Sequence, residues 1–219
     1  SLILGFPLPI ILALLLNEVS NGHFRKTFQT VSYAPHFIST VVMCGMLTLF
    51  LNPTSGIFNI IITKLGGESV NFLQDPANFK WIYVLSAVWQ EMGWGSIIYF
   101  ATLSGVDRSL LEAAEIDGAN RFQKIWYINV PVLIPTIIIL LILQCGSLLS
   151  VGYEKVYLLQ NTTNLSGSEV ISTYVYKVGL EQADFSFGAA ADLFNSVINS
   201  TILILANFIA KRTTDQGLF

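Results

Sequence analysis

Five long apolar blocks divide this sequence, and they constrain its fold more than any other feature. The blocks are Leu2–Leu16, Val31–Leu51, Trp81–Leu103, Ile128–Ser150 and Phe187–Ala210. A membrane-spanning helix needs roughly 20 consecutive apolar residues, and every block after the first is long enough. Only 11% of the 219 residues are charged, whereas soluble domains usually have about 25%. The sequence therefore predicts an all-α membrane protein with five helical spans.

The first block, Leu2–Leu16, is shorter than the others and starts directly after Ser1 without charged residues before it. A signal peptide is one interpretation, but the sequence has neither a basic segment before the block nor a small-residue cleavage site after it. We expect a span that is cut short, with a further span upstream in the parent protein. Residues 1–219 are then a single transmembrane domain whose N-terminal span is missing.

The lysines and arginines indicate which ends of the blocks face the cytoplasm. If the chain crosses the membrane at each block, segments 17–30, 104–127 and 211–219 share one side, and segments 52–80 and 151–186 share the other. The first side carries seven Lys and Arg residues, and the second carries four. Because an excess of positive charge marks the cytoplasmic side, we expect segment 104–127 and the C-terminus to be cytoplasmic.

Segment 104–131 contains signals for two helices separated by a sharp turn. Asp107 is a favourable N-cap, and strong helix formers follow it. Gly118 can adopt the left-handed conformation that ends a helix. A second amphipathic helix is expected from about Asn120, and Pro131 would fit an early turn of the next span. On these signals alone, the segment could equally be a loop that only connects two spans at the membrane surface.

The spacing within this segment matches a known signature. In order, the segment contains Glu112-Ala113-Ala114, three residues, Gly118, nine residues, Ile128, one residue, Val130 and Pro131. This order resembles the EAA loop of ABC importer permeases, written EAA-x3-G-x9-I-x-L-P. Val130 stands where the pattern has leucine, and this exchange keeps an apolar side chain.

Other parts of the chain resemble the oligosaccharide-uptake, maltose-permease-like subgroup of these permeases. The similar stretches are GFPLPIILALLLNE, SYAPHFIST, YVLSAVWQEMGWGSIIYFATLSG, STYVYKVGL and the Lys211-Arg212 tail that ends in Gly217-Leu218-Phe219. The resemblance covers nearly the whole chain. It implies a type I ABC importer permease fold, with six spans in the parent protein and a cytoplasmic coupling helix.

The resemblance also implies a set of partners in a prokaryotic cytoplasmic membrane. The short helix would dock in a cleft of an ATPase subunit, and the coupling residues would be Glu112, Ala113, Ala114, Asp117, Gly118, Ile128 and Pro131. The assembly would comprise two such ATPases, a second and non-identical permease, and an extracytoplasmic solute-binding protein that delivers a carbohydrate. ATP and Mg would bind to the ATPases, because this chain has no Gly-Lys dipeptide and hence no P-loop. We expect no enzyme activity, cofactor or metal site in this chain.

Polar residues inside the apolar blocks are the candidates for a substrate pathway, because ionisable groups are costly within a bilayer. The candidates are Glu91, Trp94, Gln144, Asp192, Asn195 and Asn199. The last three recur at i, i+3 and i+7, on one face of a helix. We predict that these side chains line a path for the carbohydrate, although they could instead form only hydrogen bonds between helices.

Two other functions remain open from the sequence. A secondary, ion-coupled transporter could use Glu91 and Asp192 as a relay without an ATPase. A membrane scaffold could use the same groups only to hold helices together. The EAA-like spacing favours the ATP-driven importer. The net charge of −3 gives no sign of a nucleic-acid partner, Cys44 and Cys145 lack metal-ligand spacing, and His36 is expected at an interface near a span end.

Overall fold

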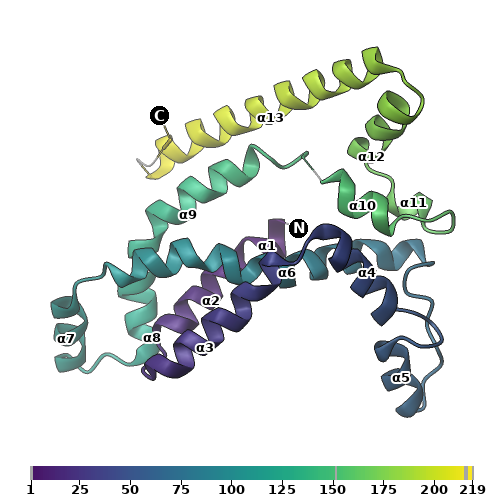
Figure 1. Cartoon of the computed structure of the whole chain (residues 1–219). Coiled ribbons are helices and arrows are strands. Elements are labelled where there is room, and N and C mark those ends of the chain that lie inside the picture. The colour runs from purple at the N-terminus through teal and green to yellow at the C-terminus, as the bar shows by residue number, and fades with distance from the viewer. Residues whose placement is uncertain (1, 151, 215–216, 219) are drawn as a thin grey trace. The chain divides into compact units, whose positions relative to one another are not determined.

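The computed structural model describes residues 2–150, 152–214 and 217–218 (Figure 1). Every element in these ranges is a helix, which confirms the all-α class. Three positions named in the sequence predictions fall outside them: Ser1 before the first block, Val151 at the start of segment 151–186, and Phe219 at the end of the tail. The chain groups into two compact units, each assembled from separate stretches of sequence.

The first unit comprises Ser1–Phe37, Ala87–Leu148 and Ile198–Phe219. It contains α1 (Leu2–Gly5), α2 (Pro7–Asn17), α3 (Gly22–Tyr33), the 3₁₀ helix η1 (Ala34–Phe37), α7 (Arg108–Ile116), α8 (Arg121–Lys124), the π-helix η2 (Ile125–Asn129) and α9 (Val130–Cys145). It also contains the C-terminal parts of two long helices, α6 (Pro76–Ser104) and α13 (Phe185–Thr214).

The core of the first unit joins α2, α6 and α9. Ala13, Tyr99, Leu103 and Leu133 are almost completely buried and form one cluster. Helices α3 and α6 also pass so close to each other that a Cβ atom on Gly93 would overlap the backbone carbonyl of Ser32. Because a backbone group cannot move aside as a flexible side chain can, only glycine fits at this crossing.

The second unit comprises Ile38–Ser86 and Leu149–Val197. It contains α4 (Thr40–Phe50), α5 (Ile57–Lys64), α10 (Tyr153–Leu159), α11 (Leu165–Ser168), α12 (Ile171–Tyr176), the π-helix η3 (Lys177–Glu181) and the N-terminal parts of α6 and α13. Its core is a cluster of buried apolar side chains from α4, α6 and α10: Cys44, Phe79, Val156 and Leu159.

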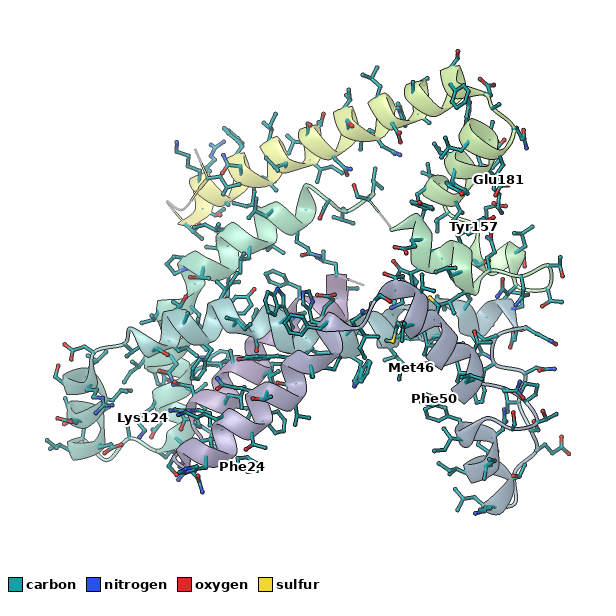
Figure 2. All side chains as sticks on the ribbon, in the orientation of Figure 1. Phe24, Met46, Phe50, Lys124, Tyr157 and Glu181 are labelled. Atoms are coloured by element: carbon teal, nitrogen blue, oxygen red, sulfur yellow. The ribbon has the colours of Figure 1, made fainter. Side chains whose placement is uncertain are left out.

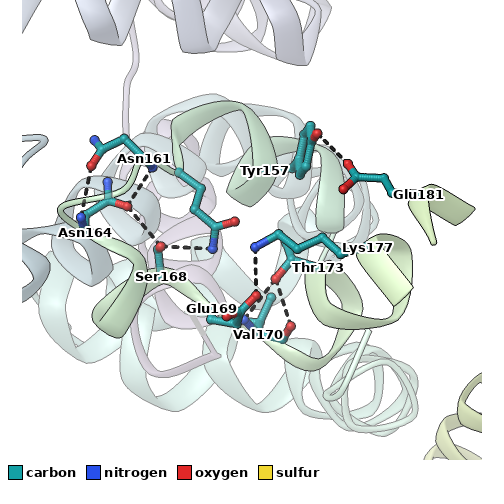
Figure 3. A network of polar contacts seen from close by, with 10 residues as sticks. Tyr157, Asn161, Asn164, Ser168, Glu169, Val170, Thr173, Lys177 and Glu181 are labelled. Carbon is teal, nitrogen blue, oxygen red and sulfur yellow. Dashed lines mark hydrogen bonds and ion pairs between the residues drawn. The ribbon is translucent and has the colours of Figure 1, made fainter. Parts of the chain in front are cut away.

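Side-chain amides hold the segment around α11 in place. The Nδ2 groups of Asn161 and Asn164 both donate to the backbone oxygen of Leu73, at 2.9 and 2.8 Å. The Oδ1 atom of Asn164 accepts from the hydroxyl of Ser168 at 3.0 Å, and both of these side chains are fully buried (Figure 3). Since buried polar groups need hydrogen-bond partners, this network gives the segment around α11 a defined structure.

Two helices in the described ranges are long and apolar enough to cross a membrane, Arg121–Cys145 and Phe185–Thr214. Gly22–Phe37 and Thr40–Phe50 add a third crossing if this pair forms one broken span. Leu2–Asn17 is apolar but shorter. The block Trp81–Leu103 does lie within a single helix, α6. The predicted number of five spans, and the single transmembrane domain, stay predictions.

The block Val31–Leu51, expected as one helical span, is divided into two helices. Pro35 lies in η1, which ends at Phe37, and α4 begins at Thr40. Proline interrupts an α-helix because it lacks an N–H donor. The hydroxyl of Ser39 then accepts a hydrogen bond from the N–H of Val42 and caps the new helix. Hydropathy did not reveal this break, because apolar residues such as Phe37 and Ile38 continue through it.

The second helix of segment 104–131 is not separate from the next span. It runs without interruption from Arg121 to Cys145 through η2. In η2 the N–H of Val130 bonds to the carbonyl of Ile125, five residues back. A proline in an α-helix clashes with the carbonyl four residues before it, and the wider π-turn lets the helix pass Pro131 without ending. Pro131 lies in the first turn of α9, as expected, but no break separates α9 from the helix that starts at Arg121.

Candidate functional site

The candidate coupling helix α7 begins where the sequence predicts it. The N–H of Ser109 donates to Oδ1 of Asp107 at 2.9 Å, so Asp107 is the N-cap. A carboxylate that accepts from the backbone at a helix start is favoured in its charged form. These hydrogen bonds with Ser109 lower the pKa of Asp107, and the cap therefore stays charged at neutral pH.

The end of α7 is a Schellman turn centred on Gly118. The N–H of Ala119 bonds to the carbonyl of Ala114 at 2.9 Å, and the N–H of Gly118 bonds to the carbonyl of Glu115 at 3.0 Å. This pattern requires a left-handed residue, and Gly118 has a φ of 79°. Asn120 then starts α8 with a capping box, in which its side chain and that of Gln123 each bond to the other's backbone.

An ion pair closes the turn between α7 and α8. Nζ of Lys124 donates to Oε1 of Glu115 at 2.7 Å, and the Lys124 side chain is only 16% exposed. Lys124 is labelled in Figure 2. This hydrogen bond, together with the lysine charge, lowers the pKa of Glu115. The two helices are thus connected by a backbone turn and by a side-chain bridge, which restricts their relative movement.

The turn encloses a hollow of about 270 Å³. Four of the seven predicted coupling residues line it: Ala114, Asp117, Gly118 and Ile128. The rest of its wall is formed by Ala119, Gln123, Lys124 and Tyr127. The other three predicted residues lie outside the hollow, with Glu112 and Ala113 exposed on α7 and Pro131 exposed near the start of α9. The structure therefore gathers part of the predicted set around one concave surface.

Helix α7 and the start of the next helix expose large apolar side chains that the described part of their unit leaves largely uncovered. No residue of α7 is buried, and Ile116 is 87% exposed. Phe122, at 84%, and Trp126, at 68%, are also exposed on the following helix. In Figure 1 α7 stands apart from the other helices of its unit. Exposed apolar groups of this size mark surfaces for a partner protein or a membrane interface.

Two of the predicted pathway residues, Glu91 and Trp94, contact His36, which was expected only at an interface near a span end. Oε2 of Glu91 lies 3.0 Å from Nδ1 of His36. The His36 ring also stacks on the Trp94 ring, with centroids 4.4 Å apart and an angle of 3°. Because His36 and Glu91 are 55 positions apart, no local pattern could have revealed this pair.

Asp192 and Asn195 lie together in the second unit. They line a pocket of about 340 Å³ formed by α10, α12, η3 and the first part of α13. Tyr153 and Tyr176, which the sequence predictions omitted, line the same pocket and stack on each other with centroids 4.8 Å apart. The spacing of Tyr153 and Tyr157 at i and i+4 on α10 could have indicated an aromatic face.

The remaining two pathway candidates do not join this pocket. Gln144 is exposed near the end of α9, where its backbone oxygen accepts from the hydroxyl of Ser147 at 3.1 Å. Asn199 continues the polar face of α13 beyond Asn195 and is half-buried. The six candidates therefore form two local pairs and two single positions rather than one described site.

Comparison with known proteins gives consistent matches over the whole chain. Protein LplB of Bacillus subtilis (strain 168) is 42% identical over 219 residues, which are 100% of this chain and 69% of the relative. The polygalacturonan/rhamnogalacturonan transport system permease protein YteP of the same organism is also 42% identical, over 100% of this chain and 68% of its own length.

A solved structure has the same fold. It is a crystal structure of a bacterial alginate ABC transporter in complex with an alginate pentasaccharide-bound periplasmic protein. It matches with a TM-score of 0.96 and 41% identity, over 100% of this chain and 76% of the matched chain. Residues 5–215 also match a family described as "Binding-protein-dependent transport system inner membrane component". This chain therefore belongs to the family of inner membrane components of binding-protein-dependent transport systems, as its helical fold and the EAA-like segment indicated.

Proposed function

We propose that this chain is the permease subunit of an ATP-driven importer that carries a carbohydrate delivered by an extracytoplasmic binding protein. Its family membership supports the dependence on a binding protein. The names of its relatives support a carbohydrate as the substrate, since they refer to polygalacturonan, rhamnogalacturonan and alginate. Since YteP is a transport system permease protein, we expect this chain to act as a permease rather than as an enzyme.

The observation that carries the proposal is the construction of α7 and its turn. Residues that hold the turn are satisfied locally, by the cap at Asp107, the Schellman turn at Gly118 and the bridge from Lys124 to Glu115. The outer face of α7, which includes Glu112 and Ala113, has no packing of its own. A rigid element with an unoccupied face is suited to receive force from a partner.

In the proposed assembly this partner is a cytoplasmic ATPase subunit. The small Ala113 side chain permits close approach, and the Glu112 carboxylate can accept charge-assisted hydrogen bonds from the partner. Because α8 continues through η2 into α9 as one helix, a displacement of α7 passes directly to a membrane span. Two ATPases would bind ATP and Mg²⁺, and a second, non-identical permease would complete the translocation pathway.

The secondary-transporter alternative loses its support. The relatives belong to binding-protein-dependent systems, and the Glu91 carboxylate is paired with His36 within its own unit. We still propose that the predicted residues line the substrate pathway. They form two local groups, Glu91 with Trp94 and Asp192 with Asn195, and two single positions, Gln144 and Asn199. Hydrogen bonding between helices remains the competing role for these residues.

The test is uptake into proteoliposomes that contain both permeases, the two ATPases and the binding protein. A charge-assisted hydrogen bond contributes roughly 1.5–3 kcal/mol, so Glu112→Ala should reduce ATP-dependent uptake by about tenfold or more. Glu68→Ala is the matched control, because Glu68 is also an exposed glutamate but lies in segment 52–80. Uptake that an ion gradient drives without the ATPases would overturn the proposal.

A further inference from the structure

Helix α5 has its polar side buried and its apolar side exposed. Asn59 is only 2% exposed, whereas the large apolar side chains on the other side of the helix and at its C-cap are exposed. These side chains form the outer face of α5: Ile57, Phe58, Ile60, Ile61 and Leu65. A helix on the surface of a soluble domain has the opposite arrangement, with its apolar stripe toward the core. The outer face of α5 therefore suits an apolar environment.

The polar side chains of this segment bond inward, to the segment itself. Nδ2 of Asn59 donates to the backbone oxygens of Asn52 and Val70, both at 3.0 Å. Oδ1 of Asn59 accepts from the N–H of Val70 at 2.7 Å. The hydroxyl of Thr63 donates to the backbone oxygen of Asn59 at 2.9 Å. The outer face, by contrast, consists only of hydrocarbon side chains, which offer no hydrogen bond to a partner.

The backbone at the end of α5 is also satisfied internally. The N–H of Gly67 bonds to the carbonyl of Ile62 at 2.9 Å. The N–H of Gly66 bonds to the carbonyl of Thr63 at 3.1 Å, and Gly66 has the positive φ that such a helix end requires. Inside a bilayer no water is present to bond to free carbonyls, so they must be satisfied within the protein. Helix α5 ends in a way that is compatible with this environment.

The outer face lies close to a helix that can belong to a membrane span. Gly22–Phe37 and Thr40–Phe50 are together apolar enough to form one broken span. Gly56, the N-cap of α5, packs so closely on the end of α4 that a Cβ atom on it would overlap the backbone oxygen of Phe50 (Figure 1). The side chains of Leu49 and Phe50 are themselves exposed. The outer face of α5 therefore continues an apolar surface that starts on α4.

The length and charge of α5 fit the surface of a bilayer. Its eight residues extend over only about 12 Å, whereas the hydrocarbon core is roughly 30 Å thick. Lys64 is the only charged residue between positions 52 and 67, and a lysine can extend its ammonium group to the lipid headgroups while its methylene groups stay in the apolar region. We propose that α5 is an interfacial helix, with its outer face inserted among lipid acyl chains at the surface of the bilayer.

The chemistry of the outer face favours lipid over a protein partner. Interfaces between proteins contain about one hydrogen bond per 100–200 Å², so both partners normally contribute polar groups. The outer face contributes none, whereas acyl chains make only non-directional apolar contacts. Since segment 52–80 is predicted to face outward, the lipid belongs to the outer leaflet. The inference goes beyond the proposed function and does not depend on the transported substrate.

Spin labels test the environment of α5 in the assembled transporter in nanodiscs. Ile57→Cys and Ile61→Cys each carry one nitroxide, in a background in which all other cysteines are replaced by serine. Both labels should be more accessible to oxygen, which concentrates in lipid, than to a water-soluble nickel chelate, and should lie about 5–10 Å deep at the boundary between headgroups and acyl chains. Ser166→Cys is the matched control, because Ser166 is exposed in the other segment that is predicted to face outward. Its label should be more accessible to the chelate.

Photolabelling of the wild type tests the same contact without any substitution. A phosphatidylcholine with a diazirine on its acyl chain should form adducts on residues 57–65 but not on residues 161–168, as mapped by mass spectrometry. The proposal fails if no adducts form on α5 or if the two spin labels favour the chelate. It also fails if neither reagent reaches the labels, or if the binding protein immobilises them, because a protein then covers α5. Neither readout uses ATP or substrate, so a failure of uptake would count against the proposed function alone.

Discussion

The turn after α7 depends on a single backbone angle. Gly118 has a φ of 79°, and Gly66, at the end of α5, has a φ of 87°. A Cβ on either glycine would meet no atom within 4 Å. Substitution at either position therefore strains the backbone without causing a clash, and the two sites differ only in their location.

Replacing Gly118 by alanine should distinguish an effect on the stability of the protein from an effect on ATP-dependent uptake. The left-handed conformation costs an L-residue roughly 1–2 kcal/mol, so Gly118→Ala and Gly66→Ala should destabilise the protein by similar amounts in thermal unfolding. ATP-dependent uptake should fall only in Gly118→Ala, and Gly118→Asn should retain more of it because asparagine tolerates this conformation. An equal loss of uptake in both alanine variants would show that the turn has no special role.

Single residues were predictable from sequence where their effect is local. The Asp107 cap and the Gly118 turn were both correct, since each involves only neighbours within a few positions. His36 was expected only at an interface near a span end, and its bond to Glu91 was missed, because the two residues meet through the packing of separate helices. The same limit applies to Tyr176, which becomes part of a pocket only when α12 approaches α13.

At the scale of the element, the pair of Glu115 and Lys124 joins two helices that have little other contact. The pKa of Glu115 is lower in the folded turn because Lys124 donates to it. A carboxyl of this kind stabilises the folded state fully above its unfolded pKa, about 4.3 for glutamate. Its contribution is then lost as the pH falls through the lower, folded pKa.

We therefore expect the turn to open more often in the acid range. The backbone amides of Gly118 and Ala119 should lose protection below about pH 4, as measured by hydrogen exchange of the assembled transporter after correction for intrinsic rates. Lys124→Gln should remove this pH dependence at the turn. The cap at Asp107 is the internal control, because it is a separate carboxylate with a lowered pKa at the other end of α7. An unchanged profile in Lys124→Gln would exclude the bridge as the cause.

Element boundaries were harder to predict than element type. The apolar blocks correctly indicated helices, but the break between Phe37 and Thr40 and the fusion of α8 with α9 were both missed. A proline lies at or next to each of these two places. Pro35 lies in a 3₁₀ turn just before the break, whereas Pro131 is accommodated by the π-turn of η2, and the local sequence does not distinguish these outcomes.

For the whole molecule, the distribution of charge predicts which segments face the cytoplasm. The test uses Arg108→Cys, Arg212→Cys and Glu68→Cys, each in a background in which Cys44 and Cys145 are replaced by serine. A membrane-impermeant maleimide should label Arg108→Cys and Arg212→Cys only in inverted vesicles, and Glu68→Cys only in right-side-out vesicles. The reverse pattern, or labelling of Arg108→Cys and Glu68→Cys from the same side, would contradict the predicted orientation.

The local construction of α7 has a consequence for how such transporters diversify. Its cap, its turn and its bridge all lie between Asp107 and Lys124 and use only one another as partners. The conformation of this segment is therefore set by its own residues and not by contacts with the membrane spans on either side. We expect that exchanging this segment alone can make a permease bind a different ATPase subunit. The residues that contact the substrate would stay unchanged.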